Sequence, residues 1–182
     1  MEKMNSRLSK ATIGFGAYIV ISAAFMLQVR NWLFGVFGAF LVVNCFRSFF
    51  ILVAVSTTLS AYRRRLGLFK VCAAFSIFVL AYLFAMWQPY FTEKTHVLTY
   101  GLLGYLAAGD LVSARRKRQL KNIILAAAFV SLTSALDEIF QRILPYRVGE
   151  VRDFITNIIS GSFGIGLLLI FKTEKKKGDA PQ

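Results

Sequence analysis

Long apolar runs separated by short charged clusters make up most of this chain. Runs of roughly 17–25 apolar residues are long enough to cross a bilayer as helices, and a helix satisfies its own backbone hydrogen bonds within lipid. The sequence therefore predicts an all-α fold, a polytopic integral membrane helix bundle. We expect about six transmembrane helices, over residues 11–28, 32–60, 67–87, 95–113, 122–144 and 153–171.

The second apolar run is unusually long and contains two polar residues, Asn44 and Arg47. We expect one long tilted helix here rather than a re-entrant pair, because no Gly-Pro break lies near its middle. Arg47 would then be a cation inside the membrane. Such a residue should face the bundle and meet an acidic or carbonyl partner, in either a packing or a functional role.

The composition excludes several other classes of protein. Hydrophobic residues make up 57% of the chain and the mean hydropathy is +0.59, which is too apolar for a soluble domain of this size. Cys45 and Cys72 both sit in apolar runs, which favours packing rather than a disulfide. The net charge of +13 is confined to short clusters between apolar runs, so we expect contact with membrane lipids and no nucleic acid. No nucleotide-binding or metal motif is present, and we expect no cofactor and no metal.

The distribution of Lys and Arg predicts the orientation. Sixteen of them lie in the amino-terminal segment, the turns at 63–70 and 115–121, and the segment at 172–177, against five on the opposite side. Because loops rich in Lys and Arg remain in the cytoplasm, both the N- and C-termini should be cytoplasmic. We expect a multi-pass protein of the cytoplasmic (inner) membrane, with residues 172–182 as a disordered basic tail.

Polar residues recur at helical spacing in the last three expected spans. Each set below forms one stripe along one helix face, and lipid cannot accommodate polar stripes, so all three should turn inward and meet. Small residues on the fourth and sixth spans would allow close approach of these helices. The stripes are Glu93, His96 and Tyr100; Ser134, Glu138 and Gln141; and Asp153, Asn157 and Gly161. The small residues are Gly101, Gly104, Ala108, Ser160, Gly161 and Gly164.

Several chemistries fit such a cluster. One His with scattered carboxylates is a weak metal signature. An apolar setting disfavours a charged carboxyl group, which suits Glu138 to a role as general acid or proton relay. Asp137 is offset by about 100° from Glu138 on a helix, so we expect only Glu138 to face the site. A polar network that only locks three helices together is the structural alternative. Asp110 is expected to be a local partner of the Arg115–Arg118 cluster.

The candidate residues follow from these stripes. The candidates for catalysis are His96, Glu138 and Asp153. The expected ligand-binding residues are Glu93, Lys94, His96, Tyr100, Glu138, Gln141, Arg147, Asp153 and Asn157.

The same residues carry a resemblance to the VanZ-like family of integral membrane proteins. In that family a D-K-x-x-H segment opens one span, and Glu93, Lys94 and His96 resemble it, with Glu in place of Asp and one residue fewer before His. An E-x-x-Q helix followed by a Pro-Gly-Arg loop is similar to Glu138, Gln141, Pro145 and Arg147, with Tyr146 in place of Gly. A D-x-x-x-N helix with glycines resembles Asp153, Asn157 and Gly164.

The resemblance implies a domain division and a class of function. Residues 75–171 would form the VanZ-like transmembrane domain, and residues 1–74 an N-terminal transmembrane hairpin region without a family match. The family's founder is associated with teicoplanin-type glycopeptide resistance, which implies a protein of the cell envelope. Its biochemical activity does not follow from membership.

The sequence leaves three functions open. In the first, a polar site at the outer leaflet binds a cell-wall or lipid-linked precursor: Arg147 and Arg152 hold its anionic group, and Glu138 with His96 orients or protonates it. In the second, the chain is a structural or accessory subunit of a larger membrane complex or a homo-oligomer. In the third, it is a small proton-coupled transporter with a polar path from Arg47 toward Asp110. Whether any reaction is catalysed stays open.

Overall fold

The computed structural model describes residues 7–112, 119–147 and 149–172. Within these ranges the chain forms seven α-helices and no strand. The expected tail falls outside the described residues except for Lys172, as does the Arg115–Arg118 cluster. The helices are α1 (Lys10–Ser22), α2 (Met26–Phe37), α3 (Ala39–Arg63), α4 (Leu68–Trp87), α5 (Phe91–Leu111), α6 (Gln119–Ile143) and α7 (Val151–Phe171).

Four of these helices, α3, α4, α6 and α7, are long and apolar enough to cross a membrane. The bent pair of α1 and α2 would count as a fifth span if the two helices are taken together. Several long apolar helices in one chain are typical of a multi-pass membrane protein. The expectation of an all-α helical bundle is therefore confirmed for the described residues. The number of six crossings and the side of the termini stay predictions.

The first two expected spans are divided differently from the sequence interpretation. Instead of helices over 11–28 and 32–60, the chain turns after Ser22 and again at Gly38. Three successive i→i+3 backbone hydrogen bonds tighten the first turn, and α1 and α2 are bent by 69° to each other. At the second turn Gly38 has a φ of 77°, a backbone conformation that glycine adopts without a steric penalty. The expectation of one long second helix was therefore wrong.

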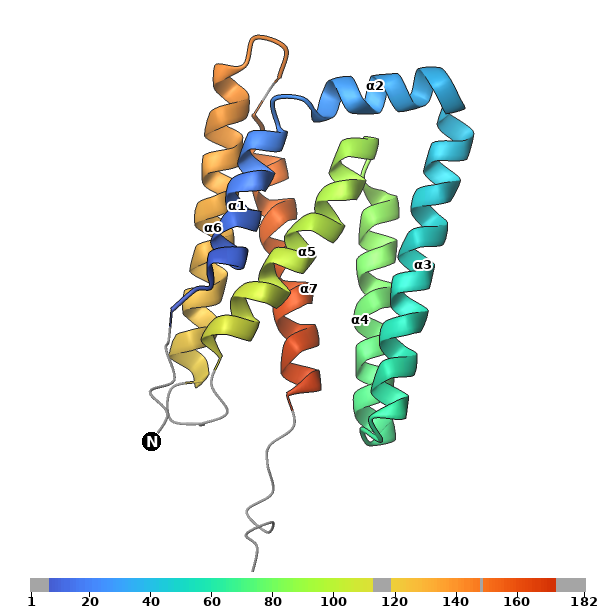
Figure 1. Cartoon of the computed structure of the whole chain (residues 1–182), viewed down its shortest axis with the longest axis vertical. Helices are drawn as coiled ribbons and strands as arrows, with labels where there is room; N and C mark the ends of the chain where they lie inside the picture. The colour runs from blue at the N-terminus through green and yellow to red at the C-terminus, as the bar shows by residue number, and fades with distance from the viewer. Residues whose placement is uncertain (1–6, 113–118, 148, 173–182) are drawn as a thin grey trace, which may run out of the picture.

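The bundle has two distinct ends (Figure 1). The start of α1, the α3–α4 turn, the start of α6 and the end of α7 lie at one end, which we call the basic end. The α4–α5 connection and the α6–α7 loop lie at the other, which we call the polar end. Helix α2 runs across the polar end from α1 to α3, and it contains no buried residue.

Helices α5 and α7 cross at close range, as the small residues predicted. A Cβ added at Gly164 would overlap the backbone carbonyl of Gly101, and one added at Gly104 would overlap the backbone of Gly161. Such contact between backbones requires glycine on both helices. Helix α6 packs against the same pair, so α5, α6 and α7 form the part of the fold that positions the polar residues.

Helices α3 and α4 form a separate hairpin that packs mainly through aromatic rings. Phe50 contacts Tyr82 across the hairpin, and Phe84 contacts Phe163 on α7. Arg47 is exposed, and its only hydrogen bond within the described residues goes to the side-chain carbonyl oxygen of Asn44, over a long 3.4 Å. Cys45 and Cys72 are likewise exposed thiols rather than packing residues.

Candidate functional site

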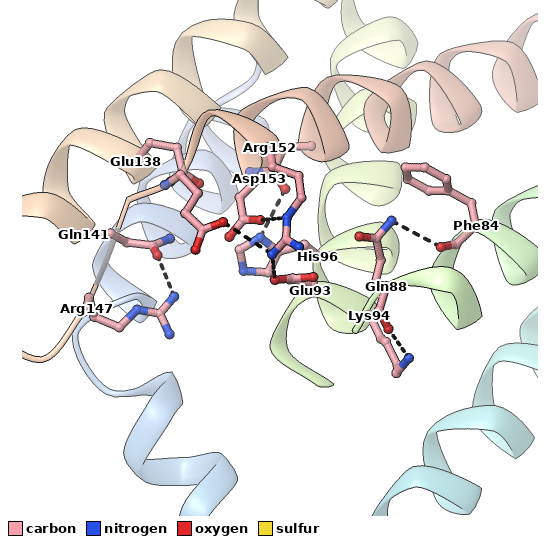
Figure 2. A network of polar contacts seen from close by, with 12 residues as sticks. Phe84, Gln88, Glu93, Lys94, His96, Glu138, Gln141, Arg147, Arg152 and Asp153 are labelled. Carbon is pink, nitrogen blue, oxygen red and sulfur yellow. Dashed lines mark hydrogen bonds and ion pairs between the residues drawn. The ribbon is translucent and has the colours of Figure 1, made fainter. Parts of the chain in front are cut away.

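The three expected stripes meet at the polar end, where the first turns of α5 and α7 and the last turns of α6 come together (Figure 2). His96 on α5 contacts Asn157 on α7, with 3.1 Å between Nδ1 and Oδ1. Asn157 in turn donates from Nδ2 to Ser134 Oγ on α6 over 3.0 Å. Since an amide oxygen only accepts, the proton of a neutral His96 lies on Nδ1, and Nε2 carries the lone pair.

A second chain of hydrogen bonds runs from α5 through α6 into the following loop. The Tyr100 hydroxyl donates to Asp137 Oδ2 over 2.9 Å, and both residues are fully or almost fully buried. Gln141 donates from Nε2 to Asp137 Oδ1 over 3.1 Å, and its Oε1 accepts from Arg147 over 2.6 Å. This chain holds Arg147 beside the cluster although it lies beyond the end of α6.

The sequence interpretation expected only Glu138 to face the site, but Asp137 faces it as well. Asp137 is 1% exposed and Glu138 is 6% exposed, so the inward face of α6 is wide enough for both. The missed signal is the spacing of Asp137 and Gln141, four residues apart and therefore neighbours on one helix face.

Arg152 is surrounded by carboxylates. Its NH2 group lies 2.5 Å from Glu93 Oε1 and 3.4 Å from Glu150 Oε2, and its Nε lies 3.6 Å from Asp153 Oδ1. A guanidinium shared by three carboxylates has little capacity left for a further anion. Arg152 therefore pairs with the acidic side chains at the start of α5 and α7.

The two carboxylate oxygens of Glu138 differ: one accepts a hydrogen bond and the other does not. Its Oε2 accepts from the backbone N–H of Glu150 over 2.9 Å, which ties α6 to the start of α7. Its Oε1 is buried and has no hydrogen-bond partner among the described residues.

Three other atoms of the cluster share this property. Most buried polar atoms in proteins have a hydrogen-bond partner, and each exception needs an explanation. Within the described ranges the cluster leaves three carboxylate oxygens and one guanidinium nitrogen buried and without a hydrogen-bond partner, although one of them, Asp153 Oδ1, lies in the ion pair with Arg152. These atoms are Glu93 Oε2, Glu138 Oε1, Asp153 Oδ1 and Arg147 Nε.

A small cavity of about 40 Å³ adjoins the cluster. His96, Asp137 and Arg147 line it from one side. From the N-terminal region it is lined by Tyr18, Ile19 and Ser22 of α1, Ala23 directly after it, and Met26 of α2. Tyr146 also donates from its hydroxyl to the carbonyl oxygen of Ala24 over 2.7 Å. The N-terminal region, which carries no part of the family resemblance, thus covers the cluster on this side.

Lys94 is the candidate that lies apart from the others (Figure 2). Its ammonium group donates to the backbone carbonyls of Met86 and Gln88, at the end of α4. Lys94 therefore closes the α4–α5 turn rather than adding charge to the cluster.

No group of three or more His, Cys, Asp or Glu side chains in the described part of the chain is arranged to hold a metal ion. The chemistry available to the cluster is hydrogen bonding, charge pairing and proton transfer through carboxyl and imidazole groups.

Among the described residues Asp110 contacts the start of α1, while the Arg115–Arg118 cluster expected as its partner lies outside them. Its Oδ2 accepts from the Thr12 hydroxyl over 2.6 Å and from the Ser9 backbone N–H over 2.8 Å. Ser9 also caps α1, since its hydroxyl accepts from the Thr12 backbone N–H. Asp110 therefore fixes the start of α1 to the end of α5 at the basic end.

Comparison with known proteins adds no relative. No family model matches the chain, and neither a curated protein nor a solved structure matches it.

Proposed function

We propose that this chain is a multi-pass protein of the cell envelope whose polar end binds the head group of an envelope or lipid-linked ligand. The observation that carries the proposal is the set of four buried atoms without a partner in the described residues. Leaving a buried donor or acceptor unpaired costs free energy, so a site that keeps four of them favours a ligand that pairs with them.

The chemistry of these atoms indicates which donor and acceptor groups a ligand should carry. The vacant oxygens of Glu93, Glu138 and Asp153 accept hydrogen bonds, so the ligand should bring hydroxyl or ammonium donors. Arg147 offers a vacant Nε and is the group that would hold an anionic part of the ligand. We assign no such role to Arg152, because three carboxylates already surround it.

The resemblance to VanZ-like proteins supports the same proposal. Its three motifs are far apart in the sequence, and their residues meet in one hydrogen-bonded cluster that includes His96, Glu138 and Asn157. We propose on this ground that the ligand belongs to the pathway through which teicoplanin-type resistance acts.

A resistance assay tests the proposal. The full chain, expressed in a teicoplanin-susceptible bacterium, should raise the concentration of teicoplanin that stops growth. Glu138→Gln and Arg147→Gln should abolish the increase at equal protein level in the membrane. The matched control is Asp110→Asn, the same loss of carboxyl charge at the opposite end of α5, which should keep it. If the wild-type chain gives no increase, the link to teicoplanin is wrong.

The orientation is a second part of the proposal. The excess of Lys and Arg at the basic end favours a cytoplasmic position for that end and an outer position for the cluster. In a chain with Cys45 and Cys72 replaced by Ser, a cysteine at exposed Pro145 should react with an impermeant thiol reagent from outside. A cysteine at Leu120 should not react. The reverse pattern would contradict an outer-leaflet site.

A further inference from the structure

A second feature lies away from the polar cluster, between the hairpin and the rest of the bundle. A groove of about 580 Å³ is lined by residues of α3, α4, α5 and α7. Its volume is within the range of roughly 300–1,000 Å³ that ligand pockets have. Phe49 on α3 and Leu102 on α5 line it and are both about half exposed, so the groove opens between these two helices.

The wall of this groove is apolar over most of its length. Phe50, Phe78 and Phe163 contribute aromatic rings from three different helices. Four hydroxyl residues also line it, Ser56, Thr57, Ser60 and Tyr105. Two of them are already hydrogen-bonded within their own helix: Ser56 donates to the carbonyl of Leu52, and Thr57 to that of Val53. The groove therefore suits a long apolar chain rather than a polar solute.

Charge appears only where the groove reaches the basic end. Ser56, Ser60 and Arg64 follow one another at intervals of four residues, and Arg64 lies at the end of α3. Arg64 is exposed, and its guanidinium makes no hydrogen bond or ion pair with any described residue. Arg63, Arg65 and Lys70 belong to the same turn, and the sequence from Lys3 to Thr92 contains no Asp or Glu.

We infer that this groove binds one anionic phospholipid, with its phosphate at Arg64 and an acyl chain along the aromatic wall. Clusters of Lys and Arg at the end of membrane helices attract anionic lipids, and a guanidinium forms strong charge-assisted hydrogen bonds with phosphate. The apolar wall of the groove matches the acyl chain of a lipid, and the guanidinium of Arg64 at its end matches the anionic head group. This inference does not depend on the function proposed for the polar cluster.

The same charges argue against a second copy of the chain in the groove. A parallel neighbour in the membrane would bring a second Arg63–Lys70 turn to the same end of the bundle. Like charges at close range destabilise such contact, and no acidic residue of α3 or α4 compensates for them.

Native mass spectrometry of the full chain, released from detergent micelles, tests the inference. The probes are phosphatidylglycerol and phosphatidylcholine with identical acyl chains, titrated separately. One phosphatidylglycerol should bind per chain, about tenfold more tightly than phosphatidylcholine, because the choline ammonium of phosphatidylcholine offsets the charge of its phosphate whereas phosphatidylglycerol has a net negative charge. Arg64→Gln should remove this preference. Arg63→Gln removes the same charge from a residue that does not line the groove, and should keep it.

A second pair of variants tests the apolar part of the groove. Ser56→Phe fills it and should weaken binding of both lipids, whereas Val55→Phe changes an adjacent, exposed side chain outside it and should not. Equal binding of the two lipids by the wild-type chain would overturn the inference. Equal effects of Arg64→Gln and Arg63→Gln, or a dimer that Ser56→Phe dissociates, would overturn it as well.

Discussion

The two ends of α5 both hold carboxylates, yet they are built differently. At the basic end Asp110 accepts two short hydrogen bonds, from Ser9 and Thr12, and has no buried atom left unpaired by the described residues. At the polar end Glu93 is held by Arg152, but its second oxygen is buried and vacant. Three neighbouring residues also have a buried side-chain atom without a hydrogen-bond partner among the described residues: Glu138 on α6, Asp153 on α7 and Arg147 in the loop between them.

This difference separates a structural contact from a candidate site. A carboxylate that only joins two helices is most stable when none of its buried oxygens lacks a hydrogen-bond partner, which holds for Asp110 among the described residues. An incomplete polar network is less stable than a complete one, so its retention favours a function that fills it. The difference therefore supports a structural role for Asp110 and the binding role that we propose for the polar cluster.

The largest expected effect on stability comes from a substitution where α5 and α7 cross at close range. In Gly164→Ala the new Cβ would overlap the carbonyl of Gly101, a backbone group that cannot move without shifting α5. We expect a loss at the upper end of the roughly 1–3 kcal/mol typical of overpacking. Gly14→Ala, where no atom lies within 4 Å of the added Cβ, is the control. Equal melting temperatures for the two variants would contradict the close crossing.

Asp110→Asn should have the next largest effect on stability. The amide keeps one acceptor oxygen but loses the charge that strengthens the bonds to Ser9 and Thr12. Bonds to charged groups contribute roughly 1.5–3 kcal/mol, and part of this should be lost. The melting temperature should fall while teicoplanin resistance per folded molecule stays normal. Loss of resistance without loss of stability would place Asp110 in the functional site instead.

A smaller effect is expected for Tyr146→Phe. This change removes the bond from the Tyr146 hydroxyl to the carbonyl of Ala24, which joins the α6–α7 loop to the α1–α2 turn. Because Tyr146 is exposed, we expect a loss near the lower end of roughly 0.5–1.5 kcal/mol. Hydrogen exchange of the α1–α2 turn should accelerate while that of α5 does not. Unchanged exchange in the turn would show that this contact does not hold α1 over the cluster.

Much of the polar cluster could be predicted from the sequence. A polar residue in an apolar run is costly in lipid, and a spacing of three or four residues places such residues on one helix face. These two facts are enough to turn His96, Glu138 and Asn157 inward. They do not give the width of a buried face, which is why Asp137 was missed. They also do not give the partners of an arginine such as Arg152, at the start of α7.

The N-terminal region was less predictable. Apolar length alone does not show where a chain changes direction, so α1, α2 and α3 were assigned as two spans. The turn at Gly38 uses a single glycine without proline, and the turn after Ser22 uses neither residue. Arg47 could not be placed from sequence because the depth of a residue depends on where its helix begins.

The smallest expected effect on stability, and the largest on function, belongs to Glu138→Gln. The amide oxygen of Gln can accept the N–H of Glu150 as Oε2 does now, and its NH₂ group would occupy the position of the vacant Oε1. The fold should therefore change by no more than about 0.5 kcal/mol, as for substitutions that break no contact. The acceptor offered to the ligand, its charge and its proton are lost.

The sharpest test of a binding role for Glu138 is to measure melting temperature and the proposed teicoplanin resistance for the wild-type chain and Glu138→Gln at equal protein level in the membrane. We expect an unchanged melting temperature and no resistance in the variant. A lower melting temperature with normal resistance per folded molecule would contradict it, because Glu138 would then be part of a network that only holds helices together.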